Sequence, residues 1–243
     1  MVALPLRDRR RGRGMSDSRL TALRWDDEYR NQRYVDEPPL PFVERILDTL
    51  RADASAWNGT GLYVGCGNGR NYLPLLDAGL ALVGLDISPE AIARLAQRRP
   101  SLPAPRLICD DFRTFRSPVA RFDYVIALQV FQHGGDADVA AYFTRVAALL
   151  RPGGLFFLRV NAVSTQIYHA HTVVDRNAQG GVTIRYDDGP KTGLLIHFFS
   201  DAELCERLEA AFVPVQHPRE DVTVRAAPKT GSWAQWETIC RRR

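Results

Sequence analysis

The sequence lacks the features that would place the protein in or across a membrane. It has no uninterrupted apolar run long enough to span a bilayer, and no apolar stretch follows the arginines near its N-terminus. These absences exclude a transmembrane helix and a secretory signal. Its four cysteines form no C-x-x-C pair, which excludes zinc-ribbon and thioredoxin motifs. We therefore expect a cytoplasmic protein with reduced thiols.

A metal site also lacks support. The pair His169-x-His171 directs two imidazoles to one face of a strand, and His197 follows in a later expected strand. No cysteine or acidic residue stands at a telling ligand spacing from these histidines, so we expect no metal.

Positive charge is concentrated at the N-terminus. Residues 1–14 carry five arginines and one aspartate, which accounts for the whole net charge of +4 and leaves the rest of the chain neutral. We expect this leader to be disordered, with Met15 as the native start. An RNA-binding arm is the alternative. The neutral body favours small-molecule acceptors over nucleic acid, and the oligomeric state is open.

Apolar segments of strand length alternate with amphipathic segments of helix length over residues 15–243. This alternation predicts one α/β domain with a doubly wound, Rossmann-like parallel sheet. Strands are expected at 61–64, 81–85, 107–109, 122–130 and 155–160, and helices at 19–36, 42–50, 71–77, 88–99 and 138–150.

The pattern changes after Asn161. Segments 171–176 and 182–186 flank a turn-rich stretch and predict a β-hairpin within an insert at about 163–193. A strand at 194–199 follows. Ser200 and Glu203 form a capping box for a helix that we expect to reach Phe212. Strands at 221–225 and 233–240 complete the chain.

Polar and glycine-rich residues follow the expected strands at the point where each ends. Ligands of parallel sheets bind at the carboxyl ends of the strands, so these residues should meet at one edge. They are Gly65–Gly69, Asp86, Asp110, Asp111 and the region of Gln129.

The glycine loop has the form G-x-G-x-G, with Gly65, Gly67 and Gly69. Glycines let the backbone turn sharply and approach a ligand closely, and the following helix offers free N–H groups. A nucleotide-dependent oxidoreductase would require G-x-G-x-x-G, but Arg70 occupies the position of its last glycine. A carboxylate at Asp86 could accept hydrogen bonds from ribose hydroxyls.

Five segments together resemble one family. They are G-C-G-N-G-R-N within 62–75, G-L-D-I-S-P-E-A-I at 84–92, C-D-D-F at 109–112, F-D-Y-V-I-A-L-Q-V-F-Q-H at 122–133 and L-R-P-G-G at 150–154. The chain over about 25–160 resembles class I S-adenosylmethionine-dependent methyltransferases, especially the tellurite- and thiopurine-resistance-like group. The resemblance implies a seven-stranded sheet with an antiparallel last strand, and S-adenosylmethionine as cofactor.

The resemblance also implies roles for matching positions. The glycine loop with Cys66 would line the methionine moiety, Asp86 would hold the ribose and Ile87 would lie against the adenine. The adenine amino group would bind Asp110 or Asp111, with D-F-R-T-F favouring Asp111. Phe112 would pack on the ring. Tyr63 stands where many relatives carry an acid, which leaves the amino end to backbone carbonyls near Ala127 and Leu128.

Methyl transfer from a sulfonium is an in-line displacement, and alignment supplies much of the rate. A base helps only when the acceptor carries a proton, and His133, Tyr29 and Tyr34 are the candidates. His133 could instead be a polar residue at a helix start. Trp25, Tyr29 and Tyr34 could cover the cofactor as a lid or simply anchor the first helix. These are the acceptor-side residues we expect: Tyr34, Tyr186 and His197.

The strand at 122–130 is not followed by N-P-P-Y or D-P-P-Y, and there is no Pro-Cys nucleophile for cytosine. The sequence therefore favours a methyltransferase acting on a small molecule. An RNA methyltransferase and a non-catalytic S-adenosylmethionine-binding module are the alternatives.

Overall fold

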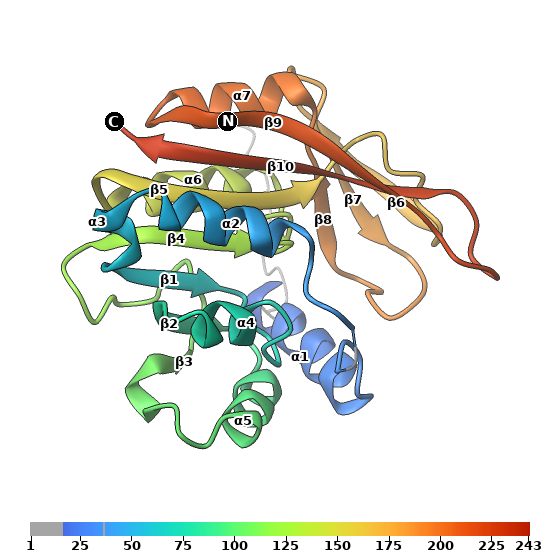
Figure 1. Ribbon diagram of the computed structural model, residues 1–243. Helices are drawn as coiled ribbons and strands as arrows, with labels where there is room; N and C mark the ends of the chain where they lie inside the picture. Colours follow the sequence, from blue (N-terminus) through green and yellow to red (C-terminus); the bar gives the residue numbers. More distant parts are fainter. Residues whose placement is uncertain (1–16, 36) are drawn as a thin grey trace, which may run out of the picture.

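The computed structural model describes residues 17–35 and 37–243. The expected leader and Met15 lie outside these residues. The main element is a seven-stranded sheet in the order β3-β2-β1-β4-β5-β10-β9 (Figure 1). Its strands are β1 Thr60–Val64, β2 Ala81–Asp86, β3 Leu107–Cys109, β4 Phe122–Leu128, β5 Leu150–Asn161, β9 Phe212–Val224 and β10 Ser232–Arg242.

Pairing within the sheet confirms the expected topology. Strands β1 to β5 pair in parallel, whereas the last strand, β10, pairs antiparallel with both β5 and β9. The four inner strands of the parallel part are almost wholly buried, because helices cover both faces of the sheet.

Two apolar clusters lie on opposite faces of the sheet. One contains residues of α2 Phe42–Arg51, α3 Ala54–Trp57, α4 Tyr72–Asp77 and α5 Pro89–Arg98. The other contains residues of α6 Asp136–Leu149 and α7 Asp201–Glu209. Figure 1 shows α2 in front of the sheet and α6 behind it. A short 3₁₀ helix, Ala104–Arg106, leads into β3.

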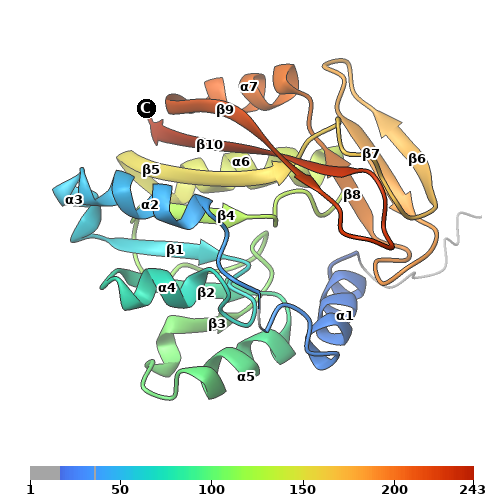
Figure 2. The same cartoon turned by 45° about the vertical axis from the view of Figure 1, so that its right-hand side comes forward.

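A second sheet and the first helix lie at the carboxyl ends of the parallel strands (Figures 1 and 2). The second sheet is antiparallel, with β6 His171–Arg176, β7 Val182–Tyr186 and β8 Leu195–Phe198 in that order. It contains the expected hairpin, to which β8 adds a third strand. The first helix, α1 Asp17–Arg30, packs against α5 and is shorter than the expected 19–36 segment.

The second sheet is joined to the loop after β4. The backbone N–H of His197 donates to the carbonyl of Gln132 at 2.7 Å, and that of Gly134 donates to Leu195 at 3.0 Å. A bridge also pairs His133 with Ile196. The loop 129–135 is therefore held between the two sheets.

Several expected boundaries were wrong, among them the start of the strand expected at 221–225. The helix after Ser200 ends at Glu209, and β9 begins at Phe212. Pro214 lies between two β-branched valines and cannot continue a helix, but an edge strand tolerates it. Strand β5 already begins at Leu150, where the Arg-Pro-Gly-Gly turn was expected, and β4 ends at Leu128 because Gln129 adopts a φ of 62°.

Candidate functional site

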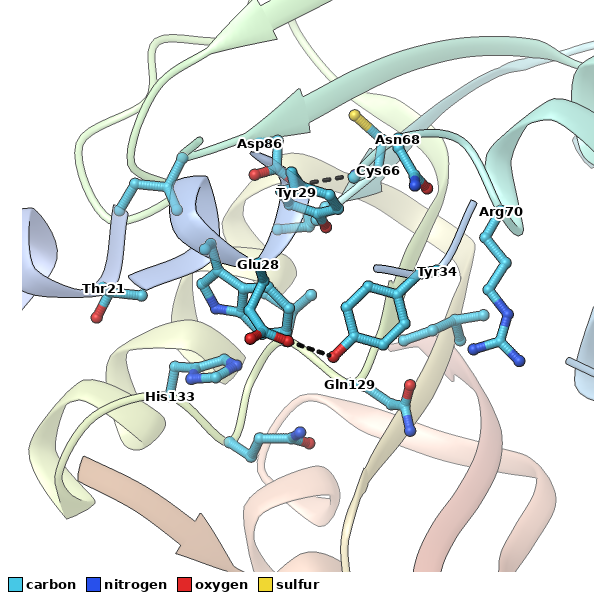
Figure 3. A pocket seen from close by; sticks show the side chains of 18 of the residues that line it. Thr21, Glu28, Tyr29, Tyr34, Cys66, Asn68, Arg70, Asp86, Gln129 and His133 are labelled. Carbon is cyan, nitrogen blue, oxygen red and sulfur yellow. Dashed lines mark hydrogen bonds between the residues drawn. The ribbon is translucent and has the colours of Figure 1, made fainter. Parts of the chain in front are cut away.

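A cavity of about 560 Å³ opens at the carboxyl edge of the main sheet (Figure 3). This volume lies within the range of about 300–1,000 Å³ typical of small-molecule sites. It is lined by residues of α1, the glycine loop, the ends of β2, β3 and β4, the second sheet and the β9–β10 turn. Of the residues expected from the sequence, these line it: Tyr29, Tyr34, Gly65, Cys66, Gly67, Asp86, Ile87, Asp110, Asp111, Phe112, Leu128, His133 and Tyr186.

The glycine loop needs its glycines for two different reasons. Gly67 has a φ of 54°, and a Cβ there would lie 2.5 Å from the Tyr29 hydroxyl oxygen. Side chains are thus excluded where the loop faces the cavity. Gly69, by contrast, does not line the cavity. Its φ is 98°, and a Cβ would collide with Leu73 and Leu95, so this glycine lets the loop pack against α4 and α5.

Asp86 ends β2 and points into the cavity close to the loop (Figure 3). Its carboxylate accepts hydrogen bonds from the backbone N–H groups of Gly67 at 2.8 Å and Ser88 at 2.9 Å. Burial nevertheless raises its pKa to about 6, and the Asp26 carboxylate contributes to the rise. The carboxylate therefore lacks part of the solvation that an ionised acid requires.

The first helix is tied to the same place. Asp26 of α1 accepts a hydrogen bond from the Ser88 hydroxyl at 2.5 Å and from the N–H of Glu90 at 3.2 Å. Ser88 in turn caps α5 by accepting from the N–H of Ala91. The capping residue therefore also anchors α1 beside the end of β2.

The two acids after β3 differ in the hydrogen bonds that their carboxylates already accept. Asp111 accepts hydrogen bonds from the Arg113 guanidinium, which also pairs with Asp138, and these contacts lower the pKa of Asp111 despite its burial. The Asp110 carboxylate accepts only the N–H of Asp111 among the described residues. Asp110 therefore keeps acceptor capacity that Asp111 has already used.

Aromatic side chains of α1 and the segment after it form one wall of the cavity. Ring centroids lie 5.9 Å apart for Trp25 and Tyr29, and 6.2 Å apart for Trp25 and Tyr34. Burial raises the pKa of Tyr29 well above its ordinary range, and the Asp86 charge adds to this. The Tyr34 hydroxyl donates to Glu28 at 3.3 Å (Figure 3).

His133 and Gln132 place unpaired polar atoms in the cavity wall. Both are buried, at 8% and 3% exposure. Neither imidazole nitrogen of His133 has a hydrogen-bond partner among the described residues, and the same holds for Oε1 of Gln132. Burial, with a smaller contribution from the Lys191 charge, lowers the pKa of His133 to about 3. Unpartnered buried polar atoms are uncommon, so these groups could form hydrogen bonds with a ligand of the cavity.

The insert contributes only part of what was expected. Tyr186 lines the cavity, and burial raises its pKa to about 12. His197 does not line the cavity. It is 1% exposed, and its ring contacts the Thr183 hydroxyl at 2.9 Å and the Glu203 carboxylate at 2.9 Å. His197 therefore joins β7 and β8 to α7. The prediction that its side chain faces the acceptor was wrong, because the ring points away from the cavity.

His197 also belongs to a group with Asp136 and Glu203 whose ligand atoms lie within 4.8 Å of one another. Both carboxylates are paired with Arg207, so the positive charge they require is already supplied. The other two histidines are not part of this group. His169 lines the cavity and pairs with Asp188 at 3.1 Å, and His171 is exposed on β6.

The region of Gln129 and Asn68 of the glycine loop were expected at this edge, and both line the cavity. Gln129 owes its place to a positive φ, and its amide donates to Gln235 at 2.8 Å. Other lining residues were not expected, because they reach the cavity from distant segments and nothing in their local sequence marks them as site residues. They are Glu28, Gln132, Lys191, Lys229 and Trp233.

The chain is similar to known methyltransferases. A family profile described as "Methyltransferase domain" matches residues 62–154. A ubiquinone biosynthesis O-methyltransferase from Methylobacterium sp. is 38% identical over 101 residues, which cover 39% of this chain and 37% of that protein. A 2-methyl-6-phytyl-1,4-hydroquinone methyltransferase from Synechocystis sp. is 27% identical over 141 residues, 54% of this chain and 43% of that protein. The chain thus spans less than half the length of these relatives.

A solved structure is similar over nearly the whole chain. It is the Burkholderia thailandensis 1,6-didemethyltoxoflavin-N1-methyltransferase with bound 1,6-didemethyltoxoflavin and S-adenosylhomocysteine, with a TM-score of 0.62 and 24% identity. The similarity covers 99% of this chain and 93% of that one.

Among the described residues, no helix is long and apolar enough to cross a membrane.

Proposed function

Because this chain belongs to the class I S-adenosylmethionine-dependent methyltransferases, we propose that it binds S-adenosylmethionine and methylates a small molecule. The observation that carries the proposal is one cavity with two parts. The glycine loop and Asp86 form one part, and aromatic rings with the unpartnered polar atoms of His133 and Gln132 form the other. The two parts correspond to a cofactor side and an acceptor side.

The residues of the cofactor side fit such a ligand. Gly65 and Gly67 have positive φ, and a Cβ at either would collide with Val130 or Tyr29, so only glycine fits where the loop meets the cavity wall. Asp86 is a buried carboxylate that accepts two backbone N–H groups and can accept further hydrogen bonds. Ribose hydroxyls are suitable donors for it. Ile87 and Phe112 line the cavity and would contact the adenine ring, while Cys66 and Leu128 would lie near the methionine part.

The adenine amino group would bind Asp110 rather than Asp111. The Asp111 carboxylate is held by Arg113 on both oxygens, whereas Asp110 accepts only one N–H. Alignment of D-F-R-T-F favoured Asp111, but the ion pair with Arg113 gives this acid a structural role in the loop. An unpaired acceptor is the better partner for an exocyclic amine.

S-adenosylmethionine, when bound, supplies an electrophilic methyl group on a sulfonium. The residues of this chain would then position the acceptor for in-line attack. None of the expected bases is suited to remove a proton at neutral pH: His133 has a pKa of about 3, and Tyr29 and Tyr34 stay phenols because their pKa values are raised. We assign them hydrogen bonding and shaping of the cavity. The acceptor would enter already deprotonated or carry a lone pair.

A small molecule suits the acceptor side better than a polynucleotide. This side is walled by α1, the second sheet and the β9–β10 turn, and its lining includes the aromatic residues Trp25, Tyr34, Tyr186 and Trp233. The relatives that match are named for methylation of ubiquinone precursors, a hydroquinone and a toxoflavin precursor. An RNA methyltransferase would methylate RNA and no small acceptor in the test below. A module that binds the cofactor without catalysis would methylate neither.

Calorimetry with S-adenosylhomocysteine and with NAD⁺, followed by a methyl-release assay on thiols, phenols, amines and tellurite, tests the proposal. We expect S-adenosylhomocysteine to bind, NAD⁺ not to bind, and at least one small acceptor to be methylated. Binding of NAD⁺ alone would refute the cofactor assignment. Tight S-adenosylhomocysteine binding with turnover only on RNA would refute the acceptor class.

A further inference from the structure

The chain contains 32 lysines and arginines, and only two of these are lysines. Both lysines stand in the same tetrapeptide, Pro-Lys-Thr-Gly, at Pro190–Gly193 and at Pro228–Gly231. The first forms the turn between β7 and β8, and the second forms the turn between β9 and β10. The two turns belong to different sheets, yet Lys191 and Lys229 both line the cavity.

Both turns are fixed in the same way. Each ends in a glycine with a positive φ, 85° in the first and 80° in the second. In each, the threonine carbonyl accepts a hydrogen bond from an arginine: Arg24 of α1 donates to Thr192 at 3.1 Å, and Arg225 donates to Thr230 at 3.0 Å. The lysine side chains therefore start from well-defined backbone positions at the cavity.

The ammonium of Lys191 lies among aromatic rings. Its nitrogen is 5.3 Å from the centroid of the Trp25 ring and 6.0 Å from that of Trp233. Within the described part of the chain it forms no hydrogen bond and no ion pair. Burial lowers its pKa. A charged group beside apolar surface is costly unless an opposite charge pairs with it, and the groups in contact with this ammonium are the faces of the two tryptophan rings.

The nearby acid does not neutralise this charge. Glu28 lies close enough to raise the pKa of Lys191, but its carboxylate accepts from Tyr34 and forms no ion pair with either lysine. Lys229 adds a second positive charge near Lys191. Two cations facing one carboxylate leave an excess positive charge on the acceptor side of the cavity.

The unpaired atoms of the loop after β4 lie close to this charge. The His133 ring is 5.5 Å from the Trp25 ring, edge to face, and Lys191 is near enough to lower the pKa of His133. A ligand that reaches Lys191 along Trp25 would thus meet the free imidazole nitrogens and the free Oε1 of Gln132.

We propose that the acceptor is a planar aromatic molecule with an anionic oxygen group, whose charge is bound by Lys191 with support from Lys229. Its ring lies among Trp25, Trp233 and Tyr34, and a polar atom of the ring system faces His133. This inference rests on the proposed function, because it names the acceptor of the same site. Lysine suits the task because a compact ammonium can meet an oxygen group without the wide fork of arginine.

The test measures binding to the protein already loaded with S-adenosylhomocysteine. The probes are pairs of aromatic carboxylates and their neutral amides, such as 4-hydroxybenzoate and 4-hydroxybenzamide, with cyclohexanecarboxylate as the non-aromatic acid. We expect the aromatic acids to bind at least tenfold more tightly than their amides and than the non-aromatic acid. Lys191→Met should abolish the preference for the acid and leave S-adenosylhomocysteine affinity within about twofold of wild type.

Arg185→Met is the matched control, because it removes one positive charge from the same small sheet outside the cavity lining. It should keep the preference. The melting temperature of Lys191→Met should stay level or rise, since an unpaired buried ammonium is removed, and a marked fall would show a structural lysine instead. A panel without preference for acids, or a preference that survives in Lys191→Met, overturns the inference. Failure of S-adenosylhomocysteine itself to bind overturns the proposed function instead.

Discussion

S-adenosylhomocysteine should bind less tightly as the pH falls through 6, because Asp86 must be ionised to accept hydrogen bonds from the ribose. The carboxylate is 7% exposed, and burial raises its pKa from 3.8 to about 6. A rise of this size corresponds to a free-energy cost of about 3 kcal/mol for the ionised form. Two hydroxyl donors could recover a large part of that cost on binding.

The direction of this pH dependence follows from the raised pKa of Asp86. In the free protein the raised pKa means that protonated Asp86 stabilises the fold, and this contribution is lost as the pH rises from 3.8 through about 6. Cofactor binding to the ionised form lowers the pKa again. Affinity should therefore be constant above pH 7 and should fall about tenfold per pH unit well below 6.

Other groups that face Asp86 do not titrate over this interval in a way that would imitate the effect. Burial raises the pKa values of Tyr29, Cys66 and Cys109, so all three stay neutral. Asp26 is a neighbouring carboxylate, and its substitution by Asn serves as the control for a general acid effect.

Calorimetric titrations at pH values from 5 to 8 measure the effect. Asp86→Asn should weaken binding at pH 8 by about 10- to 100-fold, or about 1.5–3 kcal/mol, and should abolish the pH dependence. A flat profile for the wild-type protein, or an unchanged slope in Asp86→Asn, would refute the reasoning.

Three further predictions follow from the same cavity. Gly67→Ala should abolish S-adenosylhomocysteine binding in calorimetry, because its Cβ would meet the Tyr29 hydroxyl at 2.5 Å, whereas Gly135→Ala, at an open position, should bind normally. Asp110→Asn should weaken S-adenosylhomocysteine binding by about 1–2 kcal/mol without changing the melting temperature. Asp111→Asn should lower the melting temperature, because the ion pair with Arg113 is lost. The reverse pattern would assign the adenine contact to Asp111. At saturating cofactor and acceptor, kcat should show no inflection near pH 6.5 from His133, whose pKa is about 3, and an inflection that disappears in His133→Asn would contradict this.

The sequence predicted which residues meet at the carboxyl edge of the sheet, because its signals there are local. A strand, a glycine loop and a helix follow one another within a few residues, and Asp86 ends the next strand. Parallel topology then brings the strand ends together without any knowledge of side-chain packing. Gly69 was the exception, because its conformation serves contacts with Leu73 and Leu95 that the loop pattern does not reveal.

The acceptor side could be predicted only in part, because long-range packing decides it. All but the first residue of β8 are buried, so alternation along the strand does not tell which face meets the cavity, and His197 turned toward Thr183 and Glu203. Lys191 and Lys229 lie in turns with no sequence pattern typical of a site. Their role depends on how β7–β8 and β9–β10 fold back over the same strand ends.

The two Pro-Lys-Thr-Gly turns have a consequence for how this enzyme could acquire a new acceptor. Each is the tip of an antiparallel strand pair, and neither contributes to the glycine loop or to Asp86. Turns of this kind tolerate changes in sequence and length better than the strands that carry them. If Lys191 and Lys229 bind the acceptor as proposed, exchange of either turn would alter acceptor recognition and leave the glycine loop and Asp86 unchanged. Residues that select the acceptor would then be replaceable without loss of cofactor binding.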